Sequence, residues 1–199
     1  GSPLGISGVI EDLSNLLVGR DPRNIGKLCW EMHSRTRQSP GSVVQKAIGA
    51  IENALWDIKS KALSVPVYEL FGGAVRESIP LYWSHCGTSR VRAWDLIKKP
   101  QIASYEDVSL FGEEIRDSGY KAIKTNIAVF DKNPYIYMPG FFKSQGDPGL
   151  NADIEILSKI DMWIGALREA VGDEIGIALD LNFNFKTEGY IKVGRMLEK

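Results

Sequence analysis

The chain has 199 residues, 44% of them hydrophobic, which is enough for one sizeable core or two smaller ones. Lysine and arginine number 24 and aspartate and glutamate 25, so the net charge of −1 gives no electrostatic reason to expect nucleic acid or an anionic membrane as a partner. No apolar run approaches the roughly 18 residues of a membrane span, and we therefore expect no membrane association.

The cysteines and the two ends give further expectations. Cys29 and Cys86 are too few for a disulfide framework and indicate free thiols in a cytoplasmic protein. The first residues, GSPLGISG, lack the basic region and the long apolar core of a signal peptide. The last residues, GRMLEK, stop inside a helical pattern without a glycine or proline. We expect the chain to be a partial sequence of a longer protein.

The first part of the chain follows a helical period. Apolar residues recur at helical spacing over residues 6–17, which predicts the first helix. Asp21-Pro22 and Ser39-Pro40 each combine a capping residue with a proline suited to the first helical position, so both predict helix starts. The second of these opens a long helix over residues 43–62.

From residue 76 onward the pattern alternates between strand and helix. It predicts strands over residues 79–85, 120–126 and 175–182, helices over 104–119 and 151–172, and the start of a further helix at 186. Ser104 is the expected N-cap of the first of these helices. This alternation is typical of parallel βα units. The segment 128–150 is too long for a plain connection, and we expect a lid or binding loop there.

Two of the predicted strands end in polar residues, in GYKAIKTN (119–126) and GIALDLNFNF (176–185). Side chains alternate along a strand, so Lys124 and Asn126 share one face, as Asp180 and Asn182 do. In a βα barrel the apolar residues between them would face the helices, and the four polar ones would point inward at the carboxyl ends of the strands. A lysine and a carboxylate at that rim are candidates for acid–base chemistry or metal binding. The alternative is a buried structural ion pair, with asparagines that cap loops.

The predicted strand over residues 79–85 ends in Ser84 and His85. Either side chain could face the same rim and contact a hydroxyl-rich substrate. The alternative is structural, with a hydrogen-bonded histidine at a strand end and a serine where a bulky side chain does not fit.

The segment AIGAIENALWDIKSKALSVPVYELFGG (47–73) resembles a hallmark helix of the enolase superfamily, in its mandelate racemase and muconate-lactonising branch. RESIPLYWSHCGT resembles the first barrel strand of that family, GYKAIKTN its lysine-bearing second strand, and IALDLNFNF its first metal-ligand strand. The resemblance implies an α/β fold. Residues 1–75 would be the helical part of an α+β capping domain, and residues 76–199 the first three βα units of a (βα)7β TIM-like barrel.

The resemblance also implies a chemistry. Members of this superfamily remove the proton α to a carboxylate with a Lys or His base, and Mg²⁺ stabilises the enediolate that forms. By position, Asp180 would be the first metal ligand. Lys124 would be the first lysine of a Lys-x-Lys pair and would stabilise charge near the substrate carboxylate. Asn182 lies where relatives place a residue that contacts substrate or acts as an acid.

The sequence departs from this pattern at Asn126, which replaces the second lysine, the usual base. An amide cannot abstract a carbon-bound proton. The Lys-x-Asn form resembles sugar-acid dehydratases such as galactonate dehydratase, whose base is a His–Asp pair on later strands. That type carries histidine at the place of Asn182, and asparagine is a poor proton donor. We expect the remaining metal ligands and the base beyond Lys199.

The sequence therefore predicts a Mg²⁺-dependent lyase that dehydrates a small-molecule sugar acid, with activity expected of the complete enzyme. The predicted catalytic positions are Lys124 and Asn126, the metal ligand is Asp180, and the substrate contacts are Asn182, His85 and Ser84. One alternative is a racemase or epimerase of the same superfamily, although Asn126 argues against it because two-base racemisation needs a base on each face. The other is a non-catalytic homologue or fragment that only packs with partners. We expect a symmetric homo-oligomer.

Overall fold

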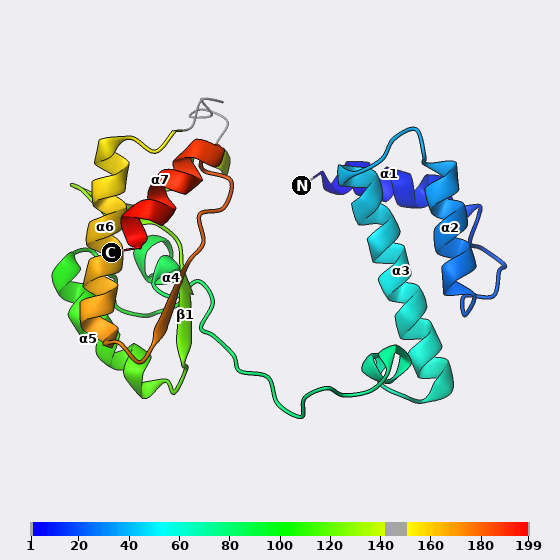
Figure 1. Cartoon of the computed structure of the whole chain (residues 1–199), viewed down its shortest axis with the longest axis horizontal. Coiled ribbons are helices and arrows are strands. Elements are labelled where there is room, and N and C mark those ends of the chain that lie inside the picture. The colour runs from blue at the N-terminus through cyan, green and yellow to red at the C-terminus, as the bar shows by residue number, and fades with distance from the viewer. Residues whose placement is uncertain (1, 142–150, 199) are drawn as a thin grey trace. The chain divides into compact units, whose positions relative to one another are not determined.

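A computed structural model of the chain describes residues 2–141 and 151–198. The chain divides into two compact units, Gly1–Ser78 and Ile79–Lys199, each with its own core (Figure 1). Among the described residues, no helix combines the length and the apolar character that crossing a membrane requires.

The first unit is helical, as its sequence period predicts. It contains α1 (Pro3–Ser14), α2 (Ile25–Arg35), α3 (Ser42–Leu63) and the short 3₁₀ helix η1 (Val67–Phe71). Each of the three α-helices contributes to one buried cluster, through Leu13, Met32 and Ile48. The apolar faces of these helices are buried against one another, and this burial is what stabilises the unit.

Neither predicted capping residue in this unit caps a helix, although α3 matches its predicted range of 43–62 to within one residue. The helix α2 begins at Ile25 rather than next to Asp21-Pro22, and α3 begins at Ser42 rather than next to Ser39-Pro40. The carboxylate of Asp21 accepts from the backbone N–H of Arg23 at 3.0 Å, so it closes a local turn instead of capping a helix. Capping residues and turn residues are the same types, and the sequence alone did not separate the two uses.

The second unit is built on two parallel strands, β1 (Ala122–Thr125) and β4 (Gly176–Leu179), with the helix α6 (Ile154–Val171) between them in the sequence. The register places Thr125 opposite Leu179. Parallel strands need a crossover connection, usually a helix, so this arrangement confirms the predicted βα alternation. The other elements are α4 (Thr88–Arg92), α5 (Tyr105–Asp117), β2 (Ala128–Phe130), β3 (Pro134–Ile136), η2 (Pro139–Phe141) and α7 (Thr187–Leu197).

The strand predicted over residues 79–85 is shorter than expected. Only Trp83 pairs with β1, through a single parallel bridge to Ile123. Trp83 N–H donates to the carbonyl of Ala122, and Lys124 N–H donates to the carbonyl of Trp83. These few backbone hydrogen bonds hold residues 79–85 beside β1, but they are too few to form a regular strand.

The long segment 128–150 begins with an antiparallel hairpin that the sequence did not predict. The strands β2 and β3 pair from Ala128 opposite Ile136 to Phe130 opposite Pro134. Residues 142–150 of this segment lie outside the described part of the chain, so the expectation of a lid or binding loop stays a prediction.

Helices cover one face of the parallel strands. Ile123 of β1 is fully buried in a cluster with Phe111 of α5 and Trp163 of α6. Leu179 and Leu181 pack, partly buried, against a second cluster that α6 and α7 share. These are the residues that the alternation in the sequence assigned to the helix-covered face. The opposite face carries Lys124 and is partly exposed.

The helix α5 confirms the predicted start and stop signals. Ser104 is its N-cap and forms a reciprocal capping box with Asp107. The helix ends at Asp117, two residues before Gly119, whose φ of 79° lies in the left-handed region that favours glycine.

The contact between α5 and α6 is close at Gly112. A Cβ atom at this position would lie 2.5 Å from the Cβ of Ala170 and 2.6 Å from its carbonyl oxygen. The guanidinium of Arg116, one turn further along α5, donates to the same carbonyl. The approach of the two helices therefore depends on the missing side chain of Gly112.

We predict that Gly112→Ala lowers the free energy of unfolding by about 1–3 kcal/mol, because a methyl group in this contact forces the two helices apart. Chemical unfolding followed by circular dichroism measures this. The control is Gly165→Ala in α6, where an added Cβ meets no atom within 4 Å. It should leave stability unchanged or raise it by up to about 1 kcal/mol through better helix propensity. Equal stabilities of the two variants would contradict the close contact.

Candidate functional site

The side chains of Lys124 and Asp180 meet at the carboxyl ends of the two parallel strands. Lys124 Nζ lies 3.3 Å from Asp180 Oδ2. The backbone N–H of Asp180 donates to the carbonyl of Thr125 at 2.8 Å, which continues the ladder one residue beyond β4. The two side chains are 26% and 31% exposed, so the pair lies at the surface of this unit and not in a dry core.

The carboxylate changes the proton affinity of the lysine. The hydrogen bond that the Lys124 ammonium donates to the Asp180 carboxylate raises the pKa of Lys124 above its ordinary value of 10.5, and partial burial opposes this rise. Lys124 is therefore an ammonium ion at neutral pH. An ammonium group can stabilise negative charge on a bound molecule, but it has no free electron pair with which to take up a proton.

Tyr82 is a third member of this group that the sequence analysis missed. The Lys124 ammonium lies 5.5 Å from the centre of the Tyr82 ring, within the range of a cation–π interaction. Tyr82 directly precedes Trp83, the bridged residue, so it lies on the face opposite Trp83. The register of Trp83 with Ile123, which decides that this is the lysine face, was not visible in the sequence.

Asn182 forms a tight turn with Asp180. Its N–H donates to Asp180 Oδ1 at 3.0 Å, and its φ of 51° is left-handed, which asparagine tolerates. Its carbonyl accepts from the hydroxyl of Tyr190. The side-chain nitrogen Nδ2 is buried and has no hydrogen-bond partner among the described residues. A buried donor without a partner costs about 1–3 kcal/mol.

Asn126 is buried directly below the ion pair, with 4% of its surface exposed. Its side-chain Oδ1 accepts from the Thr88 hydroxyl at 2.9 Å, and its Nδ2 donates to the backbone carbonyl of Asp180 at 3.3 Å. Its own carbonyl accepts from Trp163 Nε1 at 2.9 Å. Both ends of the amide are thus engaged within the protein.

Ser84 and His85 lie elsewhere in the same unit. They line a pocket of about 240 Å³ together with Arg90, Lys99 and Glu114, whereas Lys124 and Asp180 do not line it. The Ser84 hydroxyl lies 3.0 Å from His85 Nδ1, and both residues are exposed. The structure therefore brings together four of the six predicted site residues. A contact between this pair and substrate stays a prediction.

The donor set near Asp180 fits part of a magnesium site. Carboxylate oxygens are the ligands that Mg²⁺ prefers, and this ion is commonly held by one or two carboxylates together with waters and substrate. In the described part of the chain, no three His, Cys, Asp or Glu side chains converge on one point. These residues thus offer a single carboxylate ligand, Asp180, and not a complete set.

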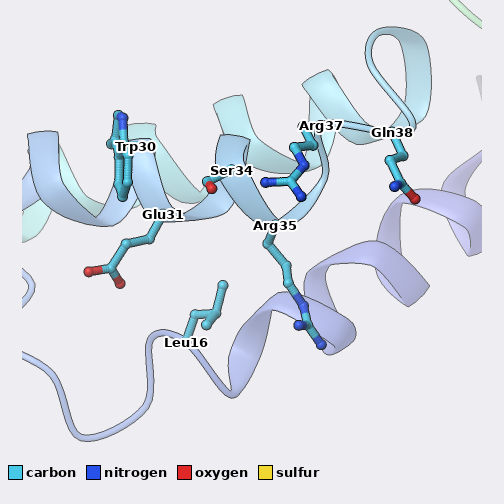
Figure 2. A pocket seen from close by; sticks show the side chains of 7 residues that line it. All are labelled: Leu16, Trp30, Glu31, Ser34, Arg35, Arg37 and Gln38. Atoms are coloured by element: carbon cyan, nitrogen blue, oxygen red, sulfur yellow. The ribbon is translucent and has the colours of Figure 1, made fainter.

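A different pocket, of about 510 Å³, lies in the helical unit (Figure 2). Trp30, Glu31, Ser34 and Arg35 of α2 line it, with Arg37, Gln38 and Leu16. Glu31 forms an ion pair with Arg20 at 2.9 Å. None of the predicted site residues lies here, since all of them belong to the second unit.

Residues 1–72 match the family model of the mandelate racemase / muconate lactonizing enzyme N-terminal domain. The chain is 29% identical over 217 residues to a "D-galactonate dehydratase family member" of Streptomyces bingchenggensis, a match that covers 100% of the chain and 47% of that protein. It is 40% identical over 82 residues to a D-galactonate dehydratase of Xanthomonas campestris, a match that covers 41% of the chain and 22% of that protein. The chain thus spans at most about half the length of these curated relatives.

A solved structure from Burkholderia xenovorans strain LB400 is also similar. That protein is provisionally named an L-alanine-DL-glutamate epimerase, and its structure is bound to magnesium and fumarate. It superposes with a TM-score of 0.88 at 42% identity and covers 100% of this chain and 49% of that one. Residues 1–72 thus match the N-terminal domain of the mandelate racemase/muconate lactonizing family, and the whole chain is similar in sequence and fold to about half of these relatives, with a helical first unit followed by the βα arrangement of β1, α6 and β4.

Proposed function

We propose that this chain provides the first metal ligand and a charge-stabilising lysine to a lyase that dehydrates a sugar acid. The observation that carries this proposal is the meeting of Lys124 and Asp180, 3.3 Å apart, at the carboxyl ends of adjacent parallel strands. That edge of the sheet is where parallel α/β proteins build their active sites. The names of the galactonate dehydratase relatives support the substrate class.

The reaction begins with loss of the proton α to the substrate carboxylate, which places additional negative charge on the carboxylate oxygens. The Lys124 ammonium is positioned to stabilise that charge. Asp180 would hold Mg²⁺, which when bound offsets the same charge as a Lewis acid. Asn182 is the proposed substrate contact because it lies in the turn that presents Asp180, and its buried Nδ2 would have to turn outward to donate to a substrate oxygen.

Dehydration and epimerisation share this first step and diverge after it. A dehydratase expels a hydroxide from the β carbon, whereas an epimerase returns a proton to the opposite face of the α carbon. The second outcome needs a base on each face. Asn126 occupies the place of one such base, and its amide is buried and engaged at both ends.

Epimerisation is nevertheless the second candidate function. The observation that favours it is the 42% identity to the structure named for an epimerase, which exceeds the 29% identity to the galactonate dehydratase family member that likewise covers the whole of this chain. If that activity is present, the second base must come from a residue other than Asn126.

We predict that Lys124→Ala and Asp180→Asn each lower kcat/KM of the complete enzyme at least about 100-fold, because each removes a charge that the transition state requires. Steady-state kinetics with the best sugar acid from a substrate screen measures this. The matched controls are Lys121→Ala and Asp173→Asn, exposed residues just before β1 and β4 at the opposite strand ends, which should retain activity. Near-normal turnover of either site variant would contradict the assigned roles.

Removal of the metal should abolish turnover of sugar acids, because the substrate carboxylate oxygens lose the positive charge that offsets their negative charge. Added Mg²⁺ should restore turnover. The product identifies the reaction. Proton NMR in D₂O should show a 2-keto-3-deoxy acid formed by loss of water. Recovery of the unchanged skeleton with deuterium and inversion at the α carbon would instead establish the epimerase. Turnover that is insensitive to chelation would contradict a metal-dependent mechanism.

We expect Asp180→Asn to lower the pKa of Lys124 toward 10.5, since it removes the carboxylate that favours the ammonium form. Because the folded pKa is raised, the contribution of this pair to stability is complete below the ordinary lysine pKa and is lost as the pH rises through the folded pKa. NMR titration of the lysine side-chain signals measures the shift. Asp173→Asn should leave the Lys124 titration unchanged, and an unchanged value in Asp180→Asn would show that the pair does not form in solution.

A further inference from the structure

The ladder between β1 and β4 ends at a point that is important for the site. Its last backbone rung is the bond from Asp180 N–H to the carbonyl of Thr125. Beyond this rung both chains leave the sheet, β1 toward the hairpin and β4 toward the turn at Asn182. The Asp180 carboxylate therefore lies at the end of β4, where the regular hydrogen bonding of the sheet stops.

The next rung is supplied by a side chain. Asn126 Nδ2 donates to the carbonyl of Asp180 at 3.3 Å, so the main chain of Asp180 is held on both its N–H and its C=O side by the end of β1. A backbone carbonyl can only accept, so the NH₂ end of the amide must face it and the oxygen must face away.

Thr88 holds the other end of the amide. Its hydroxyl accepts from the N–H of Asn126 at 3.4 Å and donates to Asn126 Oδ1 at 2.9 Å, which uses the single proton of the hydroxyl on the amide oxygen. Thr88 and Asn126 are 1% and 4% exposed. In so buried a position an amide rotated by 180° would place its oxygen against the Asp180 carbonyl, acceptor facing acceptor, which is costly.

We infer that Asn126 is a positioning residue, which holds the main chain of Asp180, and with it the carboxylate that faces Lys124, while Thr88 holds the Asn126 amide in place through its oxygen. This differs from the catalytic role that the sequence pattern suggested for position 126. The importance of the device for the reaction rests on the proposed function, whereas the positioning itself does not.

Amide hydrogen exchange of the full chain, followed residue by residue by NMR without substrate or metal, tests this inference. Thr88→Val removes the hydroxyl at nearly constant volume, and the Asp180 amide should then exchange about fivefold faster, as expected for one lost hydrogen bond. Thr88→Ser keeps the hydroxyl and loses only a methyl group, so it should restore slow exchange at Asp180. The reference is the Lys124 amide, which bonds to Trp83 on the other edge of β1 and should be unaffected.

Equal acceleration of the Asp180 and Lys124 amides in both Thr88 variants would show a general loss of stability and would overturn the positioning role. If Thr88→Val does not fold, the wild-type chain still provides a test. The Asn126 side-chain NH₂ protons should be protected from exchange, and rapid exchange with solvent would overturn the proposal. These measurements do not depend on turnover, so they distinguish a failure of this inference from a failure of the proposed function.

Discussion

The parallel pairing of β1 and β4 is the constraint on which the candidate site depends. Lys124 and Asp180 are far apart in the sequence and meet only because the register sets Lys124 opposite Ala178 and extends to the bond between Asp180 and Thr125. A slip of one residue would turn the polar side chains toward the helices and the apolar ones outward. The burial of Ile123 under α5 and α6 resists that slip, so the hydrophobic core determines where the charged groups point.

The polar groups next to the ion pair are buried and hydrogen-bonded to one another. Thr88, Asn126 and Trp163 form a connected set of hydrogen bonds that ends on the main chain of Asp180. Such a network is worth more than its separate bonds when every member is satisfied, because unpaired polar groups are costly in a low-dielectric interior. The unpaired nitrogen of Asn182 is the exception among the described residues, and it belongs to the turn that presents Asp180.

The proteins that this chain resembles are named for two reactions, dehydration and epimerisation, which share their first step and differ in the later ones. Its relatives carry dehydratase names, and a structural neighbour at higher identity carries an epimerase name. Proton removal beside a carboxylate needs the same charge stabilisation in either case, and under the proposed function Lys124 and Asp180 would supply it. What separates the two outcomes is the presence of a second base. The buried amide at position 126 cannot act as one, and this favours dehydration.

The sequence by itself determined the βα alternation, the helix-covered face of each strand, the cap of α5, and four polar residues at two strand ends. These features depend on local periods of 2 and 3.6 and on capping chemistry, which the order of residues carries directly. Only the tertiary structure decided that Tyr82 and Thr88 join the site. It also decided that Ser84 and His85 line a different pocket. The hydrogen bond from the buried Asn126 amide to the Asp180 carbonyl was likewise visible only in the structure. Register, side-chain orientation and the short helix α4 depend on contacts between segments distant in the chain, and no local pattern encodes them.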